Sequence, residues 1–143
     1  MAIAGMGGEL ISDIIENAPH FRDTGVRLIL QPMSRQAELR RYLAARGFEI
    51  TDEDYSYSAG KYYVTIVAHF TGKTYTLTPA EEHFGSPSHL LPLDEARLGY
   101  LLAKRRALKK AHDGKCAGNG NTTVERELLD YIEKFIQDNG GTV

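Results

Sequence analysis

The fold class follows from the segment Met1-Ala-Ile-Ala-Gly-Met-Gly-Gly8 and from Glu9-Leu-Ile-Ser-Asp-Ile-Ile-Glu16, which comes directly after it. Residues 2–4 form a short apolar run that predicts a buried strand, and residues 5–8 predict a glycine turn. Residues 9–16 predict a helix, because apolar side chains recur there at helical spacing, at Leu10, Ile11, Ile14 and Ile15. The order strand, turn, helix is typical of an α/β sheet.

The glycine turn has two interpretations. Ligands of open α/β sheets lie beyond the carboxyl ends of the strands, and glycines let the backbone approach a ligand there. The turn is not the Gly-x-Gly-x-x-Gly dinucleotide motif, and it lacks the Lys-Ser/Thr of a phosphate loop. A tight turn without a ligand therefore stays as open as a ligand site.

The same order repeats once. Residues 26–30 predict a second strand that ends at Gln31-Pro32, because proline cannot donate to a strand ladder. Residues 35–46 predict a helix with Ser34 as N-cap and Gly47 as C-terminal cap. We expect Leu39, Tyr42 and Leu43 to point inward, and Arg35, Arg40, Arg41 and Arg46 to point outward.

The pattern then changes to a hairpin. Residues 48–57 and 61–70 predict two strands joined by residues 58–60. A parallel sheet that ends in an antiparallel hairpin is a common mixed sheet. The first strand has one plausible parallel partner, at residues 26–31, so the chain resembles the second half of a doubly wound domain whose outer edge is exposed. Long apolar edges favour self-association.

The last third is helical. Thr78 and Glu81 predict a capping box for a short helix ending near Gly85, and Thr122 with Glu125 predicts another. Helices over 94–112 and 122–138, joined by residues 113–121, predict an antiparallel hairpin. Its apolar stripes are Leu98, Leu101, Leu102 and Leu108 on one helix and Val124, Leu128, Ile132, Phe135 and Ile136 on the other. We therefore expect a sheet domain at 1–92 and a helical hairpin at 93–143.

Charge separates along this hairpin. Residues 97–115 are mostly basic and residues 122–138 mostly acidic. The two helices either pair with each other or leave a basic patch for nucleic-acid phosphates. The patch consists of Lys104, Arg105, Arg106, Lys109 and Lys110.

Composition indicates an ordinary soluble protein of 143 residues, with a net charge of −2 and 42% hydrophobic residues. No apolar run is long enough for a membrane span, and no leader precedes the first strand, so we expect a cytoplasmic protein. The single Cys116 cannot form an internal disulfide. The five histidines lack metal-ligand spacing, so we expect no metal.

Several segments at matching spacing resemble one family. They are Ile3-Ala-Gly-Met-Gly-Gly8, Arg27-Leu-Ile-Leu-Gln-Pro32, Leu39-Arg-Arg-Tyr-Leu43 with Gly47-Phe48, and Gly60-Lys61-Tyr62-Tyr63 ahead of Ile66-Val67-Ala68. The family is the bacterial tRNA (adenine-22-N1)-methyltransferases, the TrmK family. The resemblance covers about residues 2–113, and the helical hairpin is similar to that family's coiled-coil appendage.

The resemblance implies the C-terminal half of a Rossmann-like class I methyltransferase, strands four to seven, that uses S-adenosylmethionine. The first three strands and most cofactor contacts would lie in an absent half, so a gene fragment is one expectation. The resemblance assigns cofactor and target-base approach to Gly5, Met6, Gly7 and Gly8. It assigns substrate or RNA contact to Gln31, Pro32, Lys61, Tyr63, Lys104, Arg105, Lys109 and Lys110, and it identifies no catalytic residue.

Two functions follow. The first is methylation of adenine N1 at tRNA position 22, by this chain or by an enzyme of which it is a part. The alternative is a non-catalytic RNA-binding or assembly module that needs a partner chain.

Overall fold

The computed structural model describes all 143 residues, and the chain divides into two compact units, Met1–His89 and Leu90–Val143. The first unit holds the sheet, and the second holds the helical hairpin. The elements of the first unit are β1 (Ala2–Met6), α1 (Gly8–Glu16), the 3₁₀ helix η1 (Pro19–Arg22), β2 (Arg27–Pro32), α2 (Gln36–Ala45), β3 (Phe48–Ser58), β4 (Lys61–Phe70) and α3 (Pro79–Phe84). The short helix α4 (Pro87–Leu90) follows, and the second unit consists mainly of α5 (Glu95–Ala117) and α6 (Thr123–Asp138).

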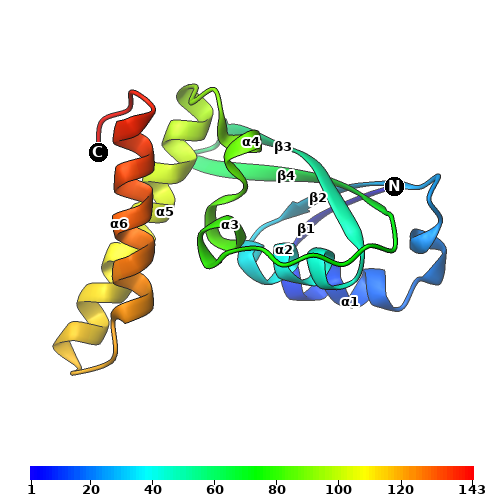
Figure 1. Cartoon of the computed structure of the whole chain (residues 1–143), viewed down its shortest axis with the longest axis horizontal. Helices are drawn as coiled ribbons and strands as arrows, with labels where there is room; N and C mark the ends of the chain where they lie inside the picture. Colours follow the sequence, from blue (N-terminus) through cyan, green and yellow to red (C-terminus); the bar gives the residue numbers. More distant parts are fainter. The chain divides into compact units, whose positions relative to one another are not determined.

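The first unit is built on a four-stranded sheet in the order β1-β2-β4-β3 (Figure 1). β1 and β2 are parallel, while β4 runs antiparallel to both β2 and β3. The predicted mixed α/β sheet is therefore confirmed. In this order β1 and β3 form the two edges, and the hairpin places its second strand next to β2.

The two faces of the sheet differ in burial. The face that α1 and α2 cover carries buried side chains, including Leu28, Leu30 and Ile66 at 0% exposure. Tyr42 on α2 donates a hydrogen bond of 2.6 Å to Glu16 at the end of α1, and this bond lowers the pKa of Glu16. The opposite face, which we call the open face, is exposed or half-exposed at Ala2, Ala4, Ile29, Gln31 and Val67.

The predicted glycine turn at residues 5–8 is wrong in its extent. The strand continues through Gly5 and Met6, and Gly5 has a φ of +78° where the β1–β2 register shifts. Gly7 alone links the strand to α1, in an extended conformation, and Gly8 is already helical. Glycine at residue 5 permits the positive φ that a bulge needs, so strand and helix join with almost no loop.

The start of α2 also differs from the expectation. Arg35, not Ser34, is the N-cap, in the left-handed conformation with a φ of 55° and without a side-chain cap. The Ser34 carbonyl is instead bonded to the Gly8 amide. The predicted outward position of Arg40 is wrong as well, since Arg40 is 0% exposed.

The β3–β4 hairpin confirms the two predicted strands, but its connection is shorter than the predicted residues 58–60. Only Ala59 and Gly60 lie between β3 and β4, with φ of 50° and 81°. Two successive positive φ values are typical of a type I′ turn, which matches the twist of the flanking strands. Gly47, with a φ of 81°, follows α2 as predicted. The 3₁₀ helix η1 lies in the connection between α1 and β2.

The second unit confirms the helical hairpin but corrects its details. α5 runs five residues beyond the predicted end at 112, through Gly114, and ends at Ala117. Thr122 makes no side-chain cap, so the predicted second capping box is absent, whereas the box at Thr78 and Glu81 is present. Val124, expected in the apolar stripe, is 58% exposed. No helix in the structure has both the length and the apolar character that crossing a membrane requires.

Candidate functional site

The carboxyl ends of the two parallel strands meet at one edge of the sheet. The Met33 amide donates to the Met6 carbonyl at 2.8 Å, and the Gly8 amide donates to the Ser34 carbonyl at 2.7 Å. These bonds tie the turn after β1 to the turn after β2. The predicted site residues Gly5–Gly8, Gln31 and Pro32 therefore lie together at the edge where α/β sheets bind ligands.

The three glycines of this edge serve different purposes. A Cβ at Gly8 would lie 2.2 Å from the Arg35 carbonyl oxygen, so only glycine lets α1 pack against the start of α2. A Cβ at Gly7 would meet the Ser34 hydroxyl at 2.9 Å. A Cβ at Gly5 would meet nothing within 4 Å. Gly8 is thus explained by packing, while the space beside Gly5 is open to a ligand.

The remaining predicted substrate residues of the first unit lie near the same edge. Gln31 is half-exposed on the open face. Tyr63 lies on the same face, on β4, which is separated from β1 by β2. Continuing the register beyond its last pair, Leu30 with Ile66, brings Met33 level with Tyr63. Lys61 is exposed at the start of β4. Pro32 is buried, and its carbonyl accepts a bond of 3.3 Å from the Gln36 side chain.

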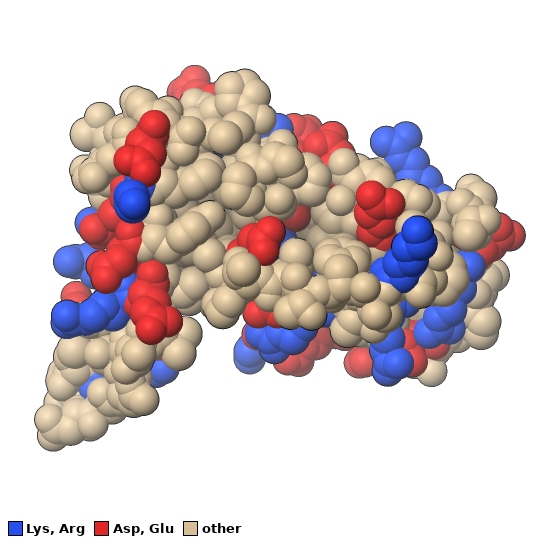
Figure 2. Space-filling view, viewed as in Figure 1, with Lys and Arg blue, Asp and Glu red and all other residues tan.

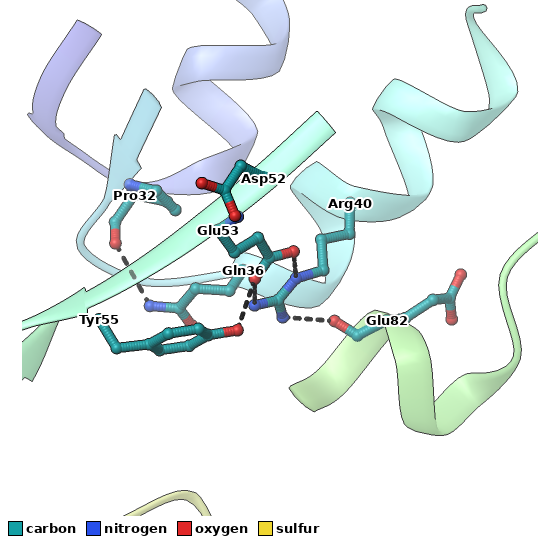
Figure 3. Close-up of polar contacts among 7 residues, drawn as sticks. All are labelled: Pro32, Gln36, Arg40, Asp52, Glu53, Tyr55 and Glu82. Carbon is teal, nitrogen blue, oxygen red and sulfur yellow. Dashed lines mark hydrogen bonds and ion pairs between the residues drawn. The ribbon is translucent and has the colours of Figure 1, made fainter. Parts of the chain in front are cut away.

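A buried ion pair joins α2 to β3 (Figure 3). Arg40 on α2 donates to both carboxylate oxygens of Glu53 on β3, at 3.0 and 2.7 Å, and both side chains are 1% exposed. Its third bond reaches the Glu82 carbonyl on α3 at 2.8 Å, and the Tyr55 hydroxyl donates to Glu53 at 2.9 Å. The pair thereby joins α2, β3 and α3.

Sequence reasoning missed this pair, although a signal existed. Ala37, Arg40 and Ala44 recur at helical spacing, and all three are buried on one face of α2. Glu53 shares its strand face with Tyr55, two residues on, which is also buried. Two oppositely charged residues on two apolar faces predict a buried pair.

The predicted basic patch of the second unit is partly occupied by intramolecular contacts. Arg105 on α5 donates to Glu133 on α6 at 2.9 Å, and the Lys104 ammonium lies 5.5 Å from the Tyr100 ring centre. Lys109 and Lys110 are exposed. On the face of the α5–α6 hairpin that is visible in Figure 2, acidic and basic side chains lie next to each other. Arg106 is exposed as well, so the predicted patch narrows to Arg106, Lys109 and Lys110.

A second contact between the helices lies near the connection of α5 to α6. The Lys115 ammonium donates a hydrogen bond to the carboxylate of Glu125, a residue that is 8% exposed. This hydrogen bond lowers the pKa of the Glu125 carboxyl. The hairpin is thus held by charge at two levels, Arg105–Glu133 and Lys115–Glu125. No group of three or more His, Cys, Asp or Glu side chains in the structure could hold a metal ion.

Comparison with known proteins relates this chain to methyltransferases. A family model described as a methyltransferase domain matches residues 1–66. A Streptococcus agalactiae structure from the NADB-Rossmann superfamily has a TM-score of 0.72 and 29% identity, over 93% of this chain and 57% of that chain. Sp1610 from Streptococcus pneumoniae, assigned as a tRNA (m1A22) methyltransferase and solved with S-adenosyl-L-methionine, has a TM-score of 0.68 and 29% identity, over 90% and 58%.

The same fold occurs in M. capricolum TrmK, solved with S-adenosyl-homocysteine, with a TM-score of 0.71 and 21% identity over 95% of this chain and 58% of that one. Comparison with curated protein sequences finds no match. The resemblance to the tRNA m1A22 methyltransferases and the partial Rossmann-like fold, both expected from the sequence, are confirmed. The chain spans 57% and 58% of the length of the two streptococcal structures.

Proposed function

We propose that this chain is part of an S-adenosylmethionine-dependent methyltransferase that acts on adenine N1 in tRNA. In this proposal it forms the part of the enzyme that the target adenine approaches. One observation carries the proposal: the two turns bonded to each other at the carboxyl edge, with open space beside Gly5. That edge lies within the segment that matches a methyltransferase domain. A relative at 29% identity was solved with S-adenosyl-L-methionine.

The geometry suits the chemistry of methyl transfer. The cofactor supplies an electrophilic methyl group, and adenine N1 supplies the lone pair that attacks it, so the main requirement is alignment at short distance. The backbone at Gly5 and at Gly7 can approach both partners because these two residues carry no side chain. Gly8, which is buried under Arg35, acts by holding this backbone in place.

In this proposal each unit supplies its own residues for contact with RNA. Gln31, Lys61 and Tyr63 lie at or near the edge and contact the target nucleotide or its phosphates. In the second unit, the exposed cations of the predicted patch are Arg106, Lys109 and Lys110. Binding to phosphates is electrostatic and falls with salt. A cytoplasmic setting remains a prediction.

The alternative, a non-catalytic RNA-binding or assembly module, is favoured by a different observation. The chain spans less than two-thirds of the length of the solved relatives, and one edge and one face of its sheet are open. An open edge also favours association with another chain. In this case the chain binds RNA without transferring a methyl group.

One assay separates the two functions. The chain is incubated with tritiated S-adenosylmethionine and a tRNA transcript that carries adenine at position 22, with a matched transcript that carries guanine there. Methyl incorporation into the adenine transcript alone supports the methyltransferase. Binding of the tRNA in a parallel filter assay, with no incorporation and no calorimetric binding of the cofactor, supports the module instead.

A further inference from the structure

Two tyrosines outside the candidate site meet at the tip of the β3–β4 hairpin. Tyr57 and Tyr62 are register partners across the strands, with ring centres 4.8 Å apart and ring planes at 54°. Tyr57 is 59% exposed. Because the rings are tilted and not stacked, Tyr62 supports Tyr57 from the side and leaves much of the Tyr57 ring open to solvent.

Stabilisation of the hairpin does not account for this exposure. Cross-strand aromatic pairs contribute only about 0.2–1 kcal/mol relative to alanine. The next tyrosine on the same face of β3 shows the contrast: Tyr55 is 5% exposed, and its hydroxyl bonds to Glu53. The strand thus buries one tyrosine and presents the other to solvent.

The tip lies at the edge that holds the candidate site. Extending the β2–β4 register brings Ser34 level with Tyr62, so the hairpin tip projects past the end of β2. The two-residue Ala59–Gly60 turn fixes the position of both rings. Lys61, next to Tyr62, is exposed and adds a cation beside the aromatic surface.

We propose that Tyr57, supported by Tyr62, is a stacking platform for an unpaired base of the RNA, and that Lys61 holds an adjacent phosphate. The proposal rests on the proposed function and adds a binding group to it. Recognition of single-stranded RNA characteristically combines aromatic side chains that stack on bases with cations that follow the backbone. A duplex offers no free base face, so the platform selects unpaired nucleotides.

The test uses the full chain and a short single-stranded RNA that carries one 2-aminopurine, whose fluorescence falls when it stacks on an aromatic ring. Wild type and Tyr57→Phe should bind with equal affinity and quench the probe. Tyr57→Leu and Tyr57→Thr remove the ring and should bind at least about fivefold more weakly, without quenching. The same RNA annealed into a duplex should not be quenched by any variant.

Circular dichroism and thermal unfolding show whether each variant keeps the hairpin, and two replacements with different side-chain shape guard against the failure of one to fold. Equal binding by Tyr57→Leu and wild type, binding without quenching, or no binding of the single strand by wild type each overturns the platform. The methyl-incorporation assay is independent. Quenching without methyl transfer leaves the platform standing and removes the proposed enzyme activity.

Discussion

At the scale of single residues, Gly7 and Gly8 offer a matched pair. In Gly8→Ala the new Cβ meets backbone at 2.2 Å, which cannot move without shifting α2, so we expect a loss of about 1–3 kcal/mol or more. In Gly7→Ala the neighbour is the Ser34 hydroxyl, which can rotate, and the extended backbone accepts alanine. We expect a change within about 1 kcal/mol there. Denaturant unfolding measures both, and equal losses would contradict the packing role of Gly8.

The Arg40–Glu53 pair supports a second prediction. Arg40→Met leaves the Glu53 carboxylate buried without its cation, and we expect a loss of about 3–5 kcal/mol in the free energy of unfolding. Adding Glu53→Gln should restore part of that stability, because the glutamine is neutral and still accepts the Tyr55 hydroxyl. The measurement is denaturant unfolding of the single and double variants. A double variant less stable than Arg40→Met would be inconsistent with a buried charge as the cause.

Residue-level prediction from sequence succeeded where spacing alone decides and failed where a partner decides. Leu39 and Leu43 point inward as their helical spacing predicts. Arg40 is buried against the outward prediction, because it is paired with Glu53, thirteen residues away on another element. The roles of Gly7 and Gly8 depend on Ser34 and Arg35 in the turn after β2, which no local pattern reveals.

At the scale of elements, the Lys115–Glu125 contact makes the helical hairpin sensitive to acid. The folded state lowers the pKa of Glu125, chiefly through the Lys115 hydrogen bond. The stability from this contact is therefore complete above the ordinary value of 4.5 and is lost as pH falls below it. Between pH 7 and pH 3 the melting temperature of Glu125→Gln should fall less than that of wild type. Glu16, also lowered, is unchanged in both proteins, so parallel falls would refute the Glu125 contribution.

The basic helix gives a second element-scale prediction. Lys109 and Lys110 are exposed, whereas Arg105 is bonded to Glu133. Lys109→Gln/Lys110→Gln should weaken tRNA binding for all sequences alike and reduce the slope of log affinity against log salt by about 0.7–0.9 for each phosphate that the variant no longer neutralises. Arg105→Gln, as matched control, should chiefly lower the stability of the hairpin. Filter binding at two salt concentrations measures affinity, and an unchanged slope in the double variant excludes phosphate binding by these lysines.

Periodicity predicted nearly every element, and its errors lie at the element ends. The four strands and the hairpin helices follow from spacing, glycine and proline. α5 continues through Gly114 because packing against α6 and the Lys115–Glu125 contact outweigh the modest helical cost of glycine. The capping box expected at Thr122 is absent: the Thr122 side chain makes no cap, and the Glu125 carboxylate bonds to Lys115. Long-range contacts, which sequence does not display, decided each of these ends.

At the scale of the first unit, the two edge strands of the sheet differ in how their outward peptide groups are hydrogen-bonded. At the β3 edge the Tyr75 hydroxyl accepts from the Ile50 amide at 3.2 Å and donates to the Phe48 carbonyl at 2.8 Å, as a neighbouring strand would. At the β1 edge Met1 bonds to β2 through both its nitrogen and its carbonyl, so alternation directs the peptide groups of Ala2 and Ala4 away from the sheet. Tyr75 therefore covers the beginning of the β3 edge, whereas the peptide groups of Ala2 and Ala4 on β1 point away from the sheet.

This asymmetry predicts that the 143-residue chain self-associates through β1. Unpaired peptide groups beside the apolar open face, where Ile29 is 41% exposed, form a template for another strand. Ala2→Lys/Ala4→Lys places two charges along this edge and should shift the chain toward monomer, while the β1–β2 pairing stays intact. The matched control is Ser56→Lys/Ser58→Lys on exposed residues of β3, the opposite edge strand, and should leave association unchanged. Light scattering after size exclusion, over a range of protein concentrations, measures the mass. A wild-type chain that stays monomeric at all concentrations, or equal effects of the two double variants, would contradict association through β1.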